Sequence, residues 1–216
     1  MDFGKAFTFV FDDPDWLKKV AINALIGLIP LIGQLYLLGW GLEVARRVAT
    51  RSATPLPDVD FGTFLGHGFK AFVVSLVYTA PIWILSIAVA IITAIGGQVS
   101  EEARMMLSTI TSICLGLFSL VFGLLLGVVM PAALTRTVVL GTIRDGLDFG
   151  AVWGLVSGAV GPYLITLVGT ILASLLAGIV GGIACGIGLI FTMAYYQAVM
   201  GHFYGQAYLE ANASAL

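Results

Sequence analysis

The composition of this 216-residue chain excludes a water-soluble fold and a nucleic-acid-binding role. Hydrophobic residues make up 59% of the sequence and charged residues only 10%, the net charge is −2 and the mean hydropathy is +1.04. Soluble domains carry roughly 25% charged residues, and binding to nucleic acid needs clustered Lys and Arg. We therefore predict an integral membrane protein whose first partner is the lipid bilayer, with no nucleic acid as a partner.

The tripeptide Asp-Phe-Gly occurs three times and divides the chain into similar parts. It stands at residues 2–4, 60–62 and 148–150, and a short aromatic stretch and a long apolar region follow each copy. Such self-similarity indicates an internal repeat. We predict one membrane domain of residues 1–216 with weak repeats at 2–59, 60–147 and 148–210. Because Asp caps helices and Phe enters the membrane interface, each tripeptide is predicted to start a surface-lying amphipathic helix.

The first repeat contains an apolar run, residues 20–42, that Gly and Pro residues interrupt. A helix is predicted to start just before this run, with Asp13 as its N-cap and Pro14 at its first helical position. The run would reach about 34 Å as one helix, which crosses a bilayer once but not twice. It could cross once or re-enter as a shallow hairpin bent at Pro30. Re-entry is preferred because it places every Lys and Arg residue except Arg104 on the same side of the membrane. The positive-inside rule favours such a distribution.

The second and third repeats hold longer apolar runs. Runs at 71–97 and 105–134 can each cross a bilayer, and a polar link containing Glu101, Glu102 and Arg104 joins them. The run at 158–205 is uncharged and would reach about 70 Å, so it must fold back, with Gly181-Gly182 as the predicted turn. We predict an all-α, polytopic transmembrane bundle of repeated helical hairpins with interfacial amphipathic helices. It has four full spans and one shallow hairpin, sits multi-pass in the cell membrane, and has both termini in the cytoplasm.

Charged side chains near the membrane boundary are candidates for contacts with a partner or with lipid. Glu43 precedes Arg46 and Arg47 by three and four residues, a spacing that places opposite charges on one helix face. The group forms either a local ion pair or a docking site for a partner or an anionic lipid. Arg136 follows Pro131 near the end of a span, and its side chain can reach the interface.

Small residues at four-residue spacing are candidates for helix packing, because they let helix backbones approach closely. They pack helices inside one chain or line a surface for self-association. The predicted packing residues are Gly123, Gly127, Gly178, Gly182 and Gly186.

Residues that carry catalytic or metal chemistry are not expected. The sequence has no Ser/His/Asp set on plausible loops, no phosphate-cradling loop and no cluster with metal-ligand spacing. Asp-Phe-Gly also occurs in protein kinases, but no Gly-rich nucleotide loop accompanies it here. His67 and His202 lack partners at ligand spacing and are interpreted as interfacial polar residues. We expect no catalytic, cofactor-binding or metal residues, no cofactor, and a protein that is not an enzyme.

Several short sequence motifs, spread over nearly the whole chain, resemble those of a known protein family. They are Asp13-Pro14-Asp15-Trp16, residues 28–33 (Leu-Ile-Pro-Leu-Ile-Gly), Arg46-Arg47 before Leu56-Pro57, Asp60-Phe61-Gly62, and residues 203–208 (Phe-Tyr-Gly-Gln-Ala-Tyr). With these the chain resembles the bacterial and archaeal membrane proteins grouped as domain of unknown function 4013. Val59 departs from the family, which usually has Trp near this position. The resemblance implies an integral membrane protein of undetermined activity, with no site residues to carry over.

Three functions fit these features. The first is a non-enzymatic structural, scaffolding or accessory subunit that forms a homo-oligomer or joins a membrane-protein complex. The second is a small transporter or channel for a neutral or lipid-like solute, which the broken helix near Pro30 favours and the lack of charge inside the spans disfavours. The third is a membrane-shaping hairpin protein, because shallow hairpins and interfacial helices wedge one leaflet apart.

Overall fold

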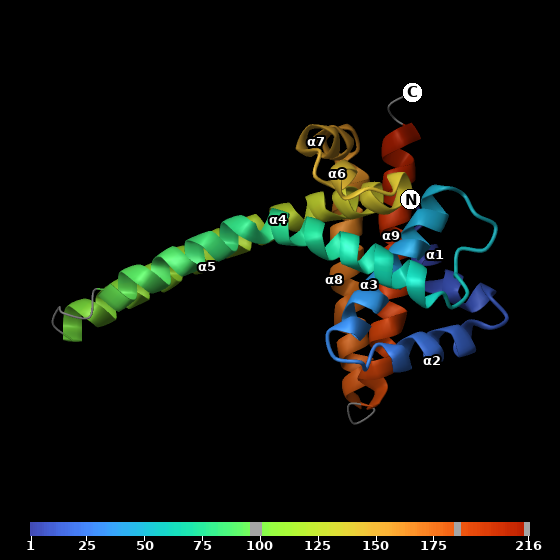
Figure 1. Cartoon of the computed structure of the whole chain (residues 1–216), viewed down its shortest axis with the longest axis horizontal. Helices are drawn as coiled ribbons and strands as arrows, with labels where there is room; N and C mark the ends of the chain where they lie inside the picture. The colour runs from blue at the N-terminus through green and yellow to red at the C-terminus, as the bar shows by residue number, and fades with distance from the viewer. Residues whose placement is uncertain (96–100, 184–186, 214–216) are drawn as a thin grey trace. The chain divides into compact units, whose positions relative to one another are not determined.

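The chain is helical throughout the part that the structure describes. The computed structural model describes residues 1–95, 101–183 and 187–213 (Figure 1). No strand occurs among these residues, and the predicted all-α class is confirmed. The elements are α1 (Phe3–Thr8), the 3-10 helix η1 (Phe9–Asp12), α2 (Trp16–Ile26), α3 (Ile32–Ala49), α4 (Phe61–Ile95), α5 (Glu101–Leu140), α6 (Ile143–Gly146), α7 (Phe149–Gly158), α8 (Val160–Ile183) and α9 (Ile187–Ala213).

The chain forms two compact units. Unit 1 comprises Met1–Val74 and Val128–Leu216, and unit 2 comprises Ser75–Gly127. Unit 1 therefore contains most of the helices, and unit 2 contains the C-terminal part of α4 and the N-terminal part of α5. The single domain and the repeat boundaries predicted above remain predictions.

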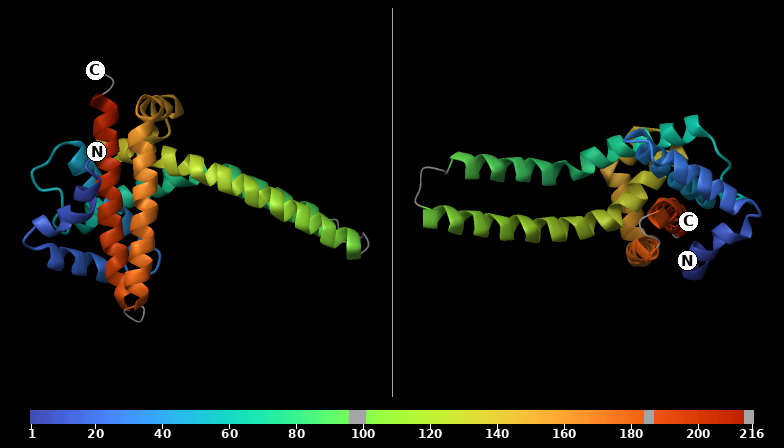
Figure 2. Two further views of the ribbon diagram at one scale, coloured as in Figure 1. Left: turned by 180° about the vertical axis from the view of Figure 1, so that it is seen from behind. Right: turned by 90° about the horizontal axis from the view of Figure 1, so that it is seen from below.

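Unit 1 is built around α9. This helix lies antiparallel to α8 and beside α3, and α1 and α2 cover more of its surface (Figure 2). The core is aromatic and small-residue in character, because large rings fill the space between closely packed helices. Its largest fully buried side chains include Tyr36, Trp40, Phe64, Tyr163 and Phe203.

Unit 2 consists of two antiparallel helical arms, residues 75–95 and 101–127 (Figure 2). At 1.5 Å per residue they extend about 31 Å and 40 Å, which matches or exceeds the hydrocarbon thickness of a bilayer. Large apolar side chains are exposed along both arms. Examples are Trp83, Ile84, Ile87, Ile113, Leu117, Leu120 and Val121.

Three of the described helical segments are long and apolar enough to cross a membrane: Phe61–Ala94, Met105–Leu140 and Val160–Ile183. They correspond to three of the four predicted spans. The fourth predicted arm is α9, which carries Tyr195, Tyr196, Gln197 and His202 within its middle turns. Other helices of unit 1 pack against α9, and it is not among the three candidate spans of the described residues.

The three Asp-Phe-Gly tripeptides start helices, as predicted. Asp2, Asp60 and Asp148 each accept a hydrogen bond from the backbone N–H three residues later, over 2.9, 3.1 and 3.0 Å. This is the geometry of a helix N-cap. α1 and α7 are short helices, but the helix after Asp60 continues without a break into the apolar part of α4. The prediction of a separate interfacial helix in the second repeat was therefore wrong.

The prediction that a helix starts at Pro14 with Asp13 as its N-cap was also wrong. α2 begins at Trp16, and Asp13 accepts the N–H of Asp15 over 2.9 Å, so Asp13 and Pro14 form a turn before the helix.

Two predicted connections lie elsewhere. α8 continues through Gly181 and Gly182 to Ile183. Gly181 instead lets α9 pack closely against α8, because a Cβ there would lie 2.6 Å from the side chains of Leu189 and Thr192. The predicted polar link at 101–104 belongs to α5, which begins at Glu101. The residues that join these helix pairs, 96–100 and 184–186, lie outside the described residues, and so does Gly186.

Candidate functional site

Glu43 is the most deeply buried charged residue among those described, with 3% of its surface exposed. It lies on α3, and Arg46 and Arg47 lie one turn later, near the helix C-terminus, where cations are favoured. Arg46 Nε donates to Glu43 Oε2 over 2.7 Å, and Arg46 Nη2 donates to Oε1 over 2.6 Å. Arg47 Nε donates to Oε1 over 3.1 Å. The ion pairs predicted from the sequence spacing are therefore present.

A histidine from another helix completes this cluster. His67 of α4 places its Nδ1 3.4 Å from Glu43 Oε2, and this nitrogen is buried without a hydrogen-bond partner among the described residues. Arg47 also donates from Nη1 to Thr54 O over 3.2 Å, which ties the loop after α3 to the cluster. The sequence offered no signal for the contact between Glu43 and His67, because these residues lie on separate helices.

The electrostatics of the cluster favour an ionised carboxylate. Burial raises the pKa of Glu43, but the hydrogen bonds from Arg46 and Arg47 outweigh it and hold this pKa below its usual value. Both carboxylate oxygens accept charged donors, so Glu43 is unsuited to act as a general base. The Arg46 side chain is 40% exposed, and its outer guanidinium edge could bind an anionic oxygen.

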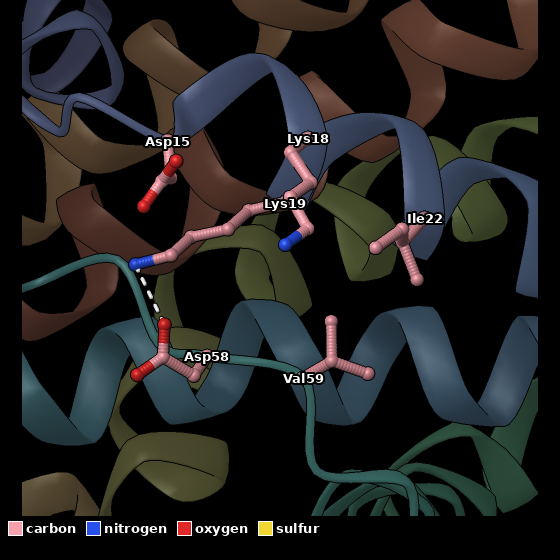
Figure 3. A pocket seen from close by; sticks show the side chains of 6 residues that line it. All are labelled: Asp15, Lys18, Lys19, Ile22, Asp58 and Val59. Carbon is pink, nitrogen blue, oxygen red and sulfur yellow. Dashed lines mark ion pairs between the residues drawn. The ribbon is translucent and has the colours of Figure 1, made fainter.

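A second charged group lines a cleft of about 300 Å³ between α2 and the loop before α4 (Figure 3). Its wall consists of Asp15, Lys18, Lys19, Ile22, Asp58 and Val59. Lys19 Nζ lies 2.9 Å from Asp58 Oδ1 and 2.7 Å from Asp13 Oδ2. Burial lowers the pKa of Lys19, but the hydrogen bonds to the two carboxylates outweigh it and raise this pKa above its usual value. Lys19 therefore stays charged and fastens α2 to this loop.

Arg136 faces the chain's own backbone. Its Nε donates to Asp145 O over 3.0 Å, and its Nη2 lies 4.0 Å from Asp148 Oδ2. Arg136 thereby links α5 to α6 and to the N-cap of α7. Its predicted contact with lipid or a partner remains a prediction.

The predicted packing glycines lie apart from the closest helix contacts inside the chain. A Cβ on Gly123, Gly178 or Gly182 would meet no atom within 4 Å. Gly127 is half-buried.

The closest contacts involve other glycines. A Cβ on Gly39 would lie 1.7 Å from Phe64 O, and one on Gly68 would lie 1.8 Å from Leu35 O, at the contact of α3 with α4. A Cβ on Gly201 would lie 1.9 Å from Gly41 O, where α9 meets α3.

Comparisons with known proteins identify a family and nothing more specific. Across the described residues, no three His, Cys, Asp or Glu side chains form a group that could hold a metal ion. No curated protein and no solved structure matches the chain. A family model described as protein of unknown function (DUF4013) matches residues 22–186, which include the cluster of Glu43, Arg46, Arg47 and His67 and the three apolar segments. The chain belongs to this family, and it is a membrane protein of uncharacterised activity.

Proposed function

We propose that the protein is a non-enzymatic membrane module that acts as a structural, scaffolding or accessory subunit in a homo-oligomer or a larger membrane complex. The observation that carries this proposal is the contrast between the two kinds of surface. Apolar side chains are extensively exposed on unit 2 and α8, whereas the charged side chains of unit 1 are largely committed to one another.

The exposed helices favour contact with lipid and with other membrane helices. None of the most apolar 18-residue window of α5 is buried inside the chain. Gly116 and Gly123 lie on this helix, and a Cβ on either would meet no atom within 4 Å. Small residues in membrane helices let a second helix approach closely. The arms therefore supply a surface on which a second copy or another membrane subunit can pack.

The charged groups favour a role without catalysis. Glu43 is saturated by Arg46 and Arg47, and Lys19 is held between Asp13 and Asp58. Catalytic acids and bases usually need a proton that can be exchanged near neutral pH and an open position for substrate. The pKa directions of Glu43 and Lys19 keep both groups charged at neutral pH. Their ion pairs hold segments of unit 1 together.

The test is the oligomeric state of the protein after gentle extraction. We expect the purified protein in native nanodiscs to have a mass above that of one chain, either as a homo-oligomer or with a stoichiometric membrane partner. A variant with Gly116→Leu and Gly123→Leu should shift towards the single chain, and Leu117→Ala on the same helix should not. A wild-type protein that is strictly monomeric and without a stoichiometric partner contradicts the proposal.

Membrane shaping is the second candidate, and α7 favours it. This short apolar helix lies across the end of α8 (Figure 1). Val152 and Val156 are buried, whereas Phe149 and Trp153 are exposed. A short helix that exposes large aromatic side chains at the membrane interface sits in one leaflet and spreads its headgroups. Reconstitution at high protein density should then reduce vesicle diameter, and an unchanged diameter would exclude this role.

A further inference from the structure

The turn between α2 and α3 exposes a continuous set of apolar side chains. We call residues 25–32 the α2–α3 tip. Leu31 is 84% exposed, the largest value among the exposed large hydrophobic residues. Clustered exposed apolar side chains on one protruding turn mark a contact with a membrane or a partner. The other exposed members are Leu25, Leu28, Ile29 and Ile32.

Leu31 also has a strained backbone. Its φ and ψ are 63° and −58°, and Ile32 N–H donates to Pro30 O over 2.7 Å across it. These values describe a classic γ-turn, a rare and strained conformation. Glycine would adopt it at little cost, so the turn itself gives no reason for leucine. A strained residue with a large exposed apolar side chain is a candidate for a functional contact outside the chain.

Most of the polar backbone groups of the tip that the structure pairs have their partners within residues 23–35. Hydrocarbon excludes irregular backbone because each unpaired N–H or C=O group costs several kcal/mol there. Pro30 has no N–H, and Gln34 Nε2 donates to Gly27 O over 3.3 Å. The remaining pairs are the N–H groups of Gly27, Leu28, Ile29, Gly33 and Leu35 with the C=O groups of Asn23, Leu25, Ile26, Ile29 and Leu31.

The surroundings of the tip are compact and apolar. A Cβ on Gly33 would lie 2.5 Å from Ile26 O and 2.6 Å from Gly27 O, so the two ends of the turn touch through their backbones. Beside the tip lies a recess of about 190 Å³ whose lining is apolar apart from Gln34. The lining residues are Ala24, Gly27, Leu28, Gln34, Leu37, Leu189, Ile190 and Met193.

We propose that the α2–α3 tip inserts into the hydrocarbon of the bilayer, with Leu31 as its deepest side chain and lipid acyl chains as its partner. The paired backbone groups allow the turn to enter hydrocarbon, and the exposed apolar side chains favour hydrocarbon over water. The charged N-terminal part of α2, with Lys18 and Lys19, remains at the aqueous boundary. This inference rests on the membrane location of the protein and not on its scaffold function, and it gives the shallow first hairpin a specific contact with lipid.

The test measures the depth of a fluorophore at residue 31. A bimane label is attached to Leu31→Cys in a background without Cys114 and Cys185, in phosphatidylcholine vesicles that contain lipids spin-labelled deep in the acyl chain. Ala53→Cys, in the exposed loop after α3, is the matched control. We expect lipid quenching several-fold stronger at residue 31 than at residue 53, and aqueous iodide quenching in the reverse order.

Two results would overturn the inference. Iodide quenching at residue 31 equal to that at residue 53 would place the tip in water. Protection from both quenchers would place it against protein, as a second copy or another subunit would require. Leu28→Cys provides a second labelling site if the first variant does not fold. A monomeric protein whose tip is quenched by lipid would refute the scaffold function and leave the tip inference intact.

Discussion

Gly68 allows α3 and α4 to make backbone contact within unit 1, and its replacement by alanine should separate them. A Cβ at residue 68 would lie 1.8 Å from Leu35 O, and the reciprocal contact at Gly39 is equally close. Nonbonded carbon and oxygen atoms require more than 3 Å, so the helices must move apart by more than an ångström. The buried rings of Tyr36 and Phe64 would then lose contacts on both helices.

The expected cost follows from overpacking. Extra methylenes in a packed core typically cost about 1–3 kcal/mol. Because the clash at residue 68 is with backbone, which cannot rotate away, we expect Gly68→Ala to lower the free energy of unfolding by about 3 kcal/mol, at the upper end of that range.

Gly66 offers a matched control two residues earlier on the same helix. A Cβ there would meet no atom within 4 Å, and alanine favours a helix over glycine by about 1 kcal/mol. Gly66→Ala should therefore leave the stability unchanged or raise it slightly. The assay is denaturant-induced unfolding in detergent micelles, followed by circular dichroism. Equal unfolding midpoints for the two variants would refute the close contact between α3 and α4.

Three further predictions concern Glu43 and Leu31. Glu43→Gln should lower the free energy of unfolding by about 2 kcal/mol, because it removes the charge from the hydrogen bonds with Arg46 and Arg47; Asp12→Asn, in the exposed pair with Lys5, should change it by less than about 1 kcal/mol. Because the pKa of Glu43 is lower in the folded chain than its ordinary value of 4.5, its contribution to stability is complete above that pH and is lost as the pH falls through the folded-state pKa. Thermal unfolding midpoints measured from pH 7 to pH 3 should therefore fall more steeply at the acid end for the wild type than for Glu43→Gln. Leu31→Gly should raise the stability in detergent by about 1 kcal/mol through relief of strain, and a lower midpoint for this variant would contradict the strained turn.

Local features of the fold could be predicted from the sequence. Asp2, Asp60 and Asp148 cap helices because the capping bond reaches only three residues along the chain. The pairing of Glu43 with Arg46 and Arg47 likewise depends only on helical spacing.

Contacts between helices could not be predicted in the same way. Gly181 and Gly182 are adjacent in sequence, yet Gly181 packs against α9 and Gly182 meets open space. Glycine spacing indicates that helices can approach, but the face on which they meet depends on the partner helix. The approach of His67 to Glu43 depends on the same kind of non-local contact between α3 and α4.

Cysteine labelling in intact cells tests most directly whether the unit 2 arms cross the membrane. Single cysteines replace Ser52, in the loop after α3, and Glu102, at the start of α5, in a background without Cys114 and Cys185. We predict that a membrane-impermeant maleimide labels residue 102 in intact cells and labels residue 52 only after permeabilisation. Labelling of both residues from the same side would contradict a hairpin whose arms cross the bilayer and return.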